Sequence, residues 1–218
     1  HVFGAKDKYG WAGDRLYTPP PVFLKDYLAM LDALGSARGV IVQSGVHGTN
    51  NDVLVDSIAA SNGRLRGIAL IPADITDAEL DRLNAAGVRG FRANLVAGTG
   101  VQFEASRKLA SRVARLGWHV QYLLDIEKFP DLDRVLGDFP VECMIDHMGR
   151  PDTRGGTAAL VDAAPDRLVW GTDWPHVMME GAMPNTGIFA ELLATWVPDE
   201  AVRKRILVDN PARLYGFK

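Results

Sequence analysis

The residue with the clearest chemical potential is Asp173, which follows a short apolar run in the last third of the chain. The run Leu168-Val-Trp170 ends at Gly171-Thr172, and Asp173 comes next. A carboxylate at the end of a buried strand is costly unless its charge is used. The carboxyl ends of parallel strands are also where such folds place their binding and catalytic groups. We therefore predict a functional role for Asp173 rather than a cap on the following turn.

Polar side chains also follow the other apolar runs of the chain. They are Ser44, His47, Thr49, Arg92, Asn94, Tyr122, Asp125, Asp146, His147 and Arg150, with His1 at the first position. Histidine, carboxylate and guanidinium groups on one rim suit the hydrolysis of a polar bond, because the carboxylate accepts a proton from water and a cation polarises the carbonyl. A guanidinium matches a carboxylate with two hydrogen bonds. Arg92, together with Arg150, is therefore predicted to select an anionic substrate.

Several of these residues also have a structural interpretation. Arg92 could pair with a structural carboxylate, and His147 could hydrogen-bond a loop. Ser44 and Thr49 lie in a glycine-rich turn, where their hydroxyls could satisfy backbone groups. His119 stands at the start of its predicted strand, the end opposite to the chemistry, so we predict a structural role for it.

Strand and helix patterns alternate along the chain. The predicted strands are 39–43, 65–71, 88–95, 118–124, 141–145 and the run that leads to Asp173. The predicted helices are 22–34, 50–60, 76–87, 101–116, 132–136, 188–196 and 200–208. This alternation implies parallel strands joined by right-handed crossovers, which leaves a doubly wound sheet and a (β/α)8 barrel open. No glycine-rich nucleotide loop follows the first strand, and polar residues follow several different strands, which favours the barrel.

The length and composition of the chain limit the classes of protein to which it can belong. The chain has 218 residues, of which 47% are hydrophobic, and a formal net charge of −3. It is long enough for a single domain over 1–218, and nothing in its charge indicates nucleic acid or a membrane surface as a partner. The lone Cys143 excludes an internal disulfide, and no apolar stretch has the length of a membrane span, so we expect a cytoplasmic protein.

Seven motifs are spread along the chain: His1-Val-Phe-Gly, Tyr17-Thr-Pro-Pro, Val42-Gln-Ser, Gly90-Phe-Arg-Ala-Asn, Ile145-Asp-His-Met-Gly-Arg, Trp170-Gly-Thr-Asp-Trp-Pro-His and Asp209-Asn-Pro-Ala-Arg-Leu-Tyr-Gly-Phe. Together they resemble the amidohydrolase superfamily, and within it the branch of TIM-barrel hydrolases similar to 2-pyrone-4,6-dicarboxylate lactonase. The resemblance runs along the whole chain. It implies a hydrolase that opens a small carboxylate-bearing lactone, as found in aromatic degradation.

The resemblance also implies roles for individual residues. Asp173 would activate the water, His147 would help to polarise the scissile carbonyl, and His1 would be the second histidine of a His-x-His pair. The positions that would hold the substrate are Arg92, Tyr17, Ser44 and Tyr122, with Arg150 and Thr49 as further candidates.

The chain departs from the family pattern in two places. The strand that would carry His-x-His is absent before His1, and the family's late helix and strand are absent near 158–161, where we infer a deletion or an omission. The expected fold is therefore a (β/α)8 TIM barrel that lacks its first strand and one late βα segment. Six strands cannot close such a barrel, and an exposed sheet edge would favour a homo-oligomer.

The resemblance to the family pattern also bears on whether the protein requires a metal. If a divalent metal such as Zn or Mn is bound, its ligands would be His1, His147 and Asp173. The strand from Trp118 brings Tyr122 and no histidine to its end, so we expect no obligatory cofactor. Two alternatives to the lactone hydrolase remain open, a metal-dependent decarboxylase of a related branch and a degenerate barrel that binds anions without catalysis.

Overall fold

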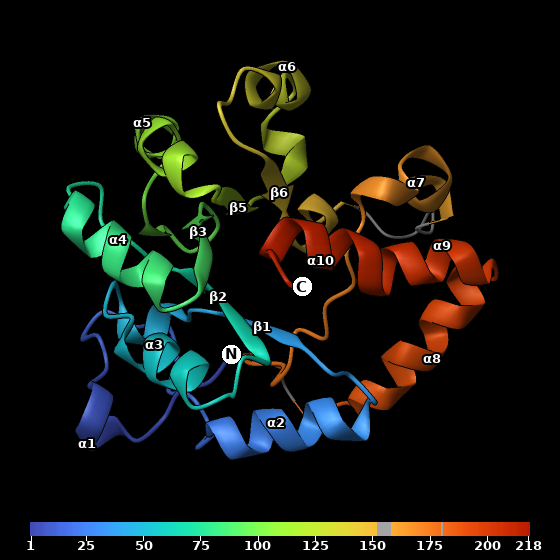
Figure 1. Cartoon of the computed structure of the whole chain (residues 1–218), viewed down its shortest axis with the longest axis horizontal. Helices are drawn as coiled ribbons and strands as arrows, with labels where there is room; N and C mark the ends of the chain where they lie inside the picture. The colour runs from blue at the N-terminus through green and yellow to red at the C-terminus, as the bar shows by residue number, and fades with distance from the viewer. Residues whose placement is uncertain (152–157, 180) are drawn as a thin grey trace.

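The chain forms an open ring of parallel strands with helices packed around it (Figure 1). This computed structural model describes residues 1–151, 158–179 and 181–218. The parallel strands run in the order β1 (Gly39–Val42), β2 (Leu65–Ala69), β3 (Val88–Asn94), β5 (His119–Leu123) and β6 (Cys143–Ile145), and the short β4 (Thr99–Gly100) pairs antiparallel with β3. This partial α/β barrel confirms the predicted fold class and five of the predicted strands.

Most of the helices lie around the outside of the ring, and the last one lies toward its centre (Figure 1). They are α1 (Lys6–Tyr9), α2 (Leu24–Ala33), α3 (Asp52–Ala59), α4 (Asp77–Ala85), α5 (Phe103–Val113), α6 (Leu132–Gly137), α7 (Ala158–Ala163), α8 (Thr186–Trp196), α9 (Glu200–Lys204) and α10 (Asn210–Tyr215). The Thr76 hydroxyl accepts a hydrogen bond of 3.2 Å from the Glu79 N–H and so fixes the start of α4. No described helix is both long and apolar enough to cross a membrane.

The main core lies between the outer face of the sheet and the helices. Phe91, Val120 and Tyr122 point outward from their strands into this core, where they meet side chains such as Leu83 and Leu109 from the helices. Because successive strand residues face opposite sides, Arg92 and Gln121 point into the ring instead. These two residues are register partners on β3 and β5.

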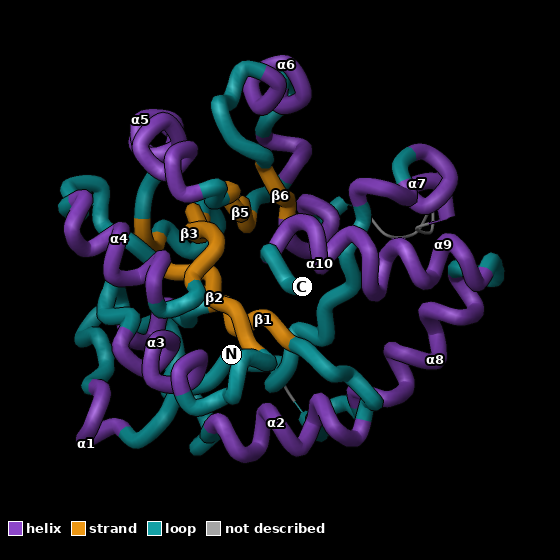
Figure 2. The backbone as a smooth tube through the Cα atoms, in the orientation of Figure 1, coloured by secondary structure: helices purple, strands orange, loops and turns teal. Residues whose placement is uncertain are grey.

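The predicted strand that leads to Asp173 is wrong: Leu168–Thr172 has no strand conformation. A strand needs a neighbour to satisfy its backbone groups, and the parallel sheet ends at β1 on one side and at β6 on the other within the described residues. The segment is held by other contacts, since Asn210 donates a hydrogen bond of 2.7 Å to the Leu168 carbonyl and Trp170 packs near Leu193. In Figure 2 the strands occupy one side of the ring, and loops with α8 to α10 occupy the other.

The C-terminal region contains more helix than the pattern indicates. The predicted helix 200–208 is α9 followed by a π-helical turn, Arg205–Asp209, which continues directly into the unpredicted α10. Pro211 near the start of α10 is compatible with a new helix because the first helical turn needs no N–H from that residue. The inferred discontinuity near 158–161 borders residues 152–157, which lie outside the described part, and positions 158–163 form α7.

Candidate active site

His147 and Asp173 approach each other at the carboxyl end of the ring. The His147 Nε2 atom lies 4.0 Å from Asp173 Oδ1, and their side chains are 42% and 58% exposed, so both are open to a ligand. Each has a left-handed backbone conformation, with φ of +50° and +51°. Such conformations are strained for residues other than glycine and concentrate at functional sites. The backbone N–H of the buried His176 donates a hydrogen bond of 2.9 Å to the Asp173 carbonyl and closes the turn that presents Asp173.

His1 lies between the end of β1 and the Asp173 loop. Its Nδ1 atom is 2.6 Å from the Val42 carbonyl, and its backbone nitrogen donates a hydrogen bond of 2.7 Å to the Trp174 carbonyl. A carbonyl only accepts, so Nδ1 carries a proton and Nε2 is the atom that remains for a ligand. His1 is therefore positioned beside the residue that follows Asp173.

Tyr17 and Ser44 form a hydroxyl pair at the same end of the ring. Their oxygens are 2.9 Å apart, and Ser44 Oγ also accepts a hydrogen bond of 3.2 Å from the Val46 N–H. Burial raises the pKa of the Tyr17 hydroxyl, and the Ser44 hydrogen bond and the nearby Arg92 charge offset only part of this effect. Tyr17 is therefore a protonated donor at neutral pH.

Arg92 is buried inside the ring and is paired with Asp146. Its Nη2 donates to Asp146 Oδ2, and Gln121 Nε2 donates to Asp146 Oδ1. The side chains of Arg92 and Asp146 are only 10% and 8% exposed. Arg92 thus has the structural carboxylate partner that the sequence left open, and it still acts electrostatically on the Tyr17 hydroxyl.

Two predicted substrate-binding residues have other partners. Tyr122 is fully buried on the outer face of β5, where its hydroxyl lies 2.6 Å from Ser106 Oγ of α5, so the structure separates it from His147 and Asp173. Arg150 is half exposed, and its Nε lies 3.0 Å from Asp125 Oδ1.

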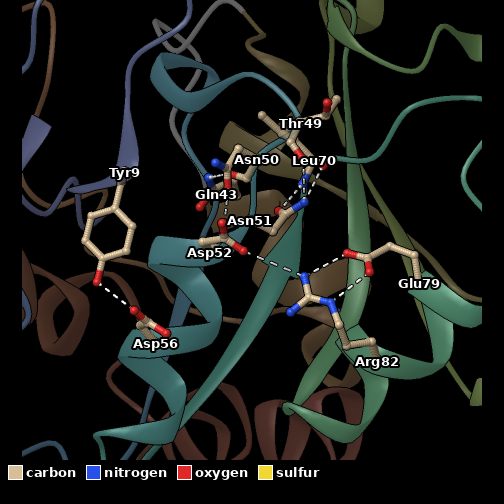
Figure 3. Close-up of polar contacts among 10 residues, drawn as sticks. All are labelled: Tyr9, Gln43, Thr49, Asn50, Asn51, Asp52, Asp56, Leu70, Glu79 and Arg82. Atoms are coloured by element: carbon tan, nitrogen blue, oxygen red, sulfur yellow. Dashed lines mark hydrogen bonds and ion pairs between the residues drawn. The ribbon is translucent and has the colours of Figure 1, made fainter. Parts of the chain in front are cut away.

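Thr49 belongs to a different depression, a pocket of about 270 Å³ between the loops that follow β1 and β2. The lining residues are Thr49, Asn51, Pro72, Asp74, Ile75, Thr76 and Glu79. Figure 3 shows Thr49 above Asn51, whose side chain donates hydrogen bonds to the Thr49 and Leu70 carbonyls. The lining includes neither His147 nor Asp173, so the structure does not bring Thr49 to their site.

The sequence patterns do not indicate a role for Gln121 or for Asp146. Gln121 is an interior position of the predicted strand 118–124, and in the structure it is the register partner of Arg92. A buried amide on the inward face of a strand is a signal that could have identified it, since such a group needs a polar partner.

The donor set for a metal is incomplete in the described part of the chain, where no three His, Cys, Asp or Glu side chains are arranged to hold an ion. His147 and Asp173 provide two donors, and the Nε2 atom of His1 is not arranged with them to hold an ion. A catalytic zinc site needs about three protein ligands. The described residues therefore do not fit a bound metal.

Comparisons with known proteins identify the family. The amidohydrolase family profile matches residues 1–164 and 156–217. A curated 2-pyrone-4,6-dicarboxylate hydrolase from Comamonas testosteroni is 34% identical over 268 aligned positions, which cover 99% of this chain and 88% of the relative. A curated 4-sulfomuconolactone hydrolase from Rhizobium radiobacter is 33% identical, with coverage of 99% and 88%.

The fold comparison gives the same result. A solved structure from Pseudomonas putida that carries the name of a 2-pyrone-4,6-dicarboxylic acid hydrolase superposes with a TM-score of 0.84 at 29% identity, over 100% of this chain and 96% of that one. A more distant amidohydrolase structure, from Burkholderia multivorans, contains bound zinc (TM-score 0.69, 18% identity, 99% and 96% coverage). The chain therefore belongs to the amidohydrolase family of hydrolases, and the Comamonas and Rhizobium relatives are named as hydrolases of a pyrone dicarboxylate and of a sulfomuconolactone.

Proposed function

We propose that this protein hydrolyses the ring ester of a small lactone that bears one or more carboxylates. The observation that carries the proposal is the approach of His147 Nε2 to Asp173 Oδ1 at 4.0 Å, on the same end of the ring as the Tyr17–Ser44 hydroxyl pair. A carboxylate that is open to solvent can accept a proton from water, and an adjacent imidazole can donate to a carbonyl oxygen.

The reaction is an addition followed by an elimination. Asp173 takes a proton from water as the water oxygen bonds to the lactone carbonyl carbon, and the carbonyl oxygen becomes an oxyanion. His147 and His1, when protonated, donate to that oxyanion. Collapse of the intermediate breaks the acyl carbon–ring oxygen bond, and the ring oxygen takes up the proton that Asp173 removed from water, so that the open-chain acid forms and Asp173 is again a carboxylate.

The anionic part of the substrate is held by a different set of groups. Arg92 provides a fixed positive charge, and Tyr17 and Ser44 provide hydroxyl donors. Arg150 can supply a second cation from the rim because its side chain is half exposed, and an ion pair at such a site is weak. The ring acids in the names of the Comamonas and Rhizobium relatives also carry anionic groups, which supports this substrate class.

The test is the Asp173→Asn variant, assayed with 2-pyrone-4,6-dicarboxylate and with a muconolactone. Loss of a general base should lower kcat by about 10²- to 10⁴-fold while the circular dichroism spectrum stays unchanged. The matched control is Asp138→Asn, which removes an exposed carboxylate at the end of α6. Turnover by Asp173→Asn at the wild-type rate would show that Asp173 is not the general base.

A second candidate is an anion-binding barrel without turnover. One observation in its favour is the irregular conformation of Leu168–Thr172, the segment that leads to Asp173. Another is the alignment with the Comamonas relative, which spans 268 positions whereas this chain has 218 residues. Calorimetric binding of the dicarboxylate with no hydrolysis of any lactone would support this candidate.

We also propose that the chain forms a single domain over 1–218, with a discontinuity near 158–161, and that the protein is cytoplasmic. We propose that it forms a homo-oligomer, which light scattering would detect.

A further inference from the structure

Three buried polar side chains form a chain across the interior of the ring. They come from successive strands: Arg92 from β3, Gln121 from β5, and Asp146 from the residue directly after β6. Asp146 accepts from both neighbours, through Oδ2 from Arg92 and through Oδ1 from Gln121. All three residues are at most 9% exposed.

The pair of hydrogen bonds fixes the orientation of the Asp146 carboxylate. Without Gln121, either carboxylate oxygen could face Arg92, and the group could rotate about its last bond. With Gln121 on Oδ1, Oδ2 is held toward the guanidinium. The Nη2–Oδ2 hydrogen bond then ties the Arg92 guanidinium to a carboxylate that cannot turn.

The fixed guanidinium retains donors for a ligand. Arg92 uses Nη2 for Asp146, and its Nε is buried without a partner among the described residues. Nη1 also makes no hydrogen bond within that part of the chain but, unlike Nε, it is not sealed from solvent. Nη1 is therefore the donor that is left for an incoming carboxylate.

The position of Asp146 in the chain links this network to the hydrolytic pair. His147 follows Asp146 directly, and its backbone has a left-handed conformation that the short helical turn Asp146–Gly149 must hold. Anchoring Asp146 at both oxygens therefore also anchors one end of the segment that presents His147 to Asp173.

We infer that Gln121 and Asp146 are positioning residues that set Arg92 to receive one carboxylate of the substrate, so that Gln121 contributes to the discrimination between an anionic lactone and its neutral ester. The inference rests on the proposed function. Asp146 also compensates the Arg92 charge, which means that the selectivity depends on the direction of the Nη1 donor and not on an excess of positive charge.

The test compares two glutamine variants on two substrates. Gln121→Met removes the donor to Asp146 at nearly constant volume. Gln43→Met is the matched control, because Gln43 is equally buried and its Nε2 also makes one hydrogen bond, 2.7 Å to the Asn50 carbonyl. The substrates are 2-pyrone-4,6-dicarboxylate and its methyl esters.

For Gln121→Met we expect KM for the acid to rise about tenfold, the effect of one charge-assisted hydrogen bond, with kcat changed less than KM and the ester parameters unchanged. Gln43→Met should leave the acid-to-ester ratio of kcat/KM at the wild-type value. An unchanged ratio in Gln121→Met, or an equal change in Gln43→Met, would overturn the inference.

Two further measurements keep the outcome decisive. Gln121→Glu can donate to Asp146 only when its new carboxyl is protonated, so its KM for the acid, relative to wild type, should increase with pH. If wild type hydrolyses neither substrate, the proposed function fails on its own, and the inference is then judged by calorimetry with benzene-1,3-dicarboxylate. Weaker binding by Gln121→Met than by Gln43→Met supports it, and equal binding refutes it.

Discussion

The buried His119 should make the fold sensitive to acid. Its side chain is 2% exposed, and its ring packs edge-on against Tyr215 of α10 at a centroid distance of 5.4 Å. Neither ring nitrogen has a hydrogen-bond partner within the described residues. Burial lowers the pKa of His119 from 6.5 to about 4, and the Glu142 carboxylate offsets only part of this shift.

The sign and size of the effect follow from proton linkage. Between the unfolded pKa of 6.5 and the folded pKa of about 4, the unfolded chain binds a proton that the folded chain does not, so the free energy of unfolding decreases as the pH falls. At about pH 4.5 the loss relative to pH 7.5 is roughly 2.5 kcal/mol, since each unit of pKa difference corresponds to about 1.4 kcal/mol.

The assay is urea unfolding at both pH values for wild type and for His119→Met, which keeps an apolar side chain of similar volume and cannot titrate. We expect the variant to lose roughly 2.5 kcal/mol less than wild type over this pH range. Subtracting one profile from the other removes the contribution of all other titrating groups. Parallel profiles for the two proteins would show that His119 is not held neutral by burial, and the reasoning would fail.

Three further predictions test the site. Tyr122→Phe should lower the free energy of unfolding by about 1 kcal/mol, because the hydroxyl is hydrogen-bonded to Ser106 of α5. It should leave KM for the lactone unchanged in steady-state kinetics, and a raised KM would show that Tyr122 contacts the substrate. Arg92→Met should destabilise the protein by about 3–5 kcal/mol in urea unfolding, because it leaves Asp146 as an unpaired buried charge, whereas Arg150→Met breaks an exposed pair and should cost less than about 1 kcal/mol; equal losses would contradict the difference in burial. Dialysis against a chelator should leave kcat unchanged, since the described residues lack a three-ligand metal set, and recovery of lost activity on adding zinc would contradict this.

Most of the helices and strands were predictable because their signals are local. The five parallel strands begin and end within two residues of the predicted limits, and the Thr76 cap begins its helix as the sequence indicates. The strand at Leu168–Thr172 was wrong because strand formation depends on a neighbour that the described sheet does not provide. Its apolar, β-branched composition carries no information about that neighbour.

The sequence by itself determined the chemical inventory of the site. The polar residues that follow the apolar runs, above all His147 and Asp173, could be identified because parallel strands direct their carboxyl ends to one edge. Only the tertiary structure decided which side chains meet. Tyr122 and Gln121 are neighbours on one strand, yet one hydroxyl bonds to α5 and the other side chain bonds to Asp146, since successive residues face opposite sides and a shift of one position reverses them. Partner choice in a buried network depends on the register between strands that are far apart in the chain, and no local pattern encodes that register.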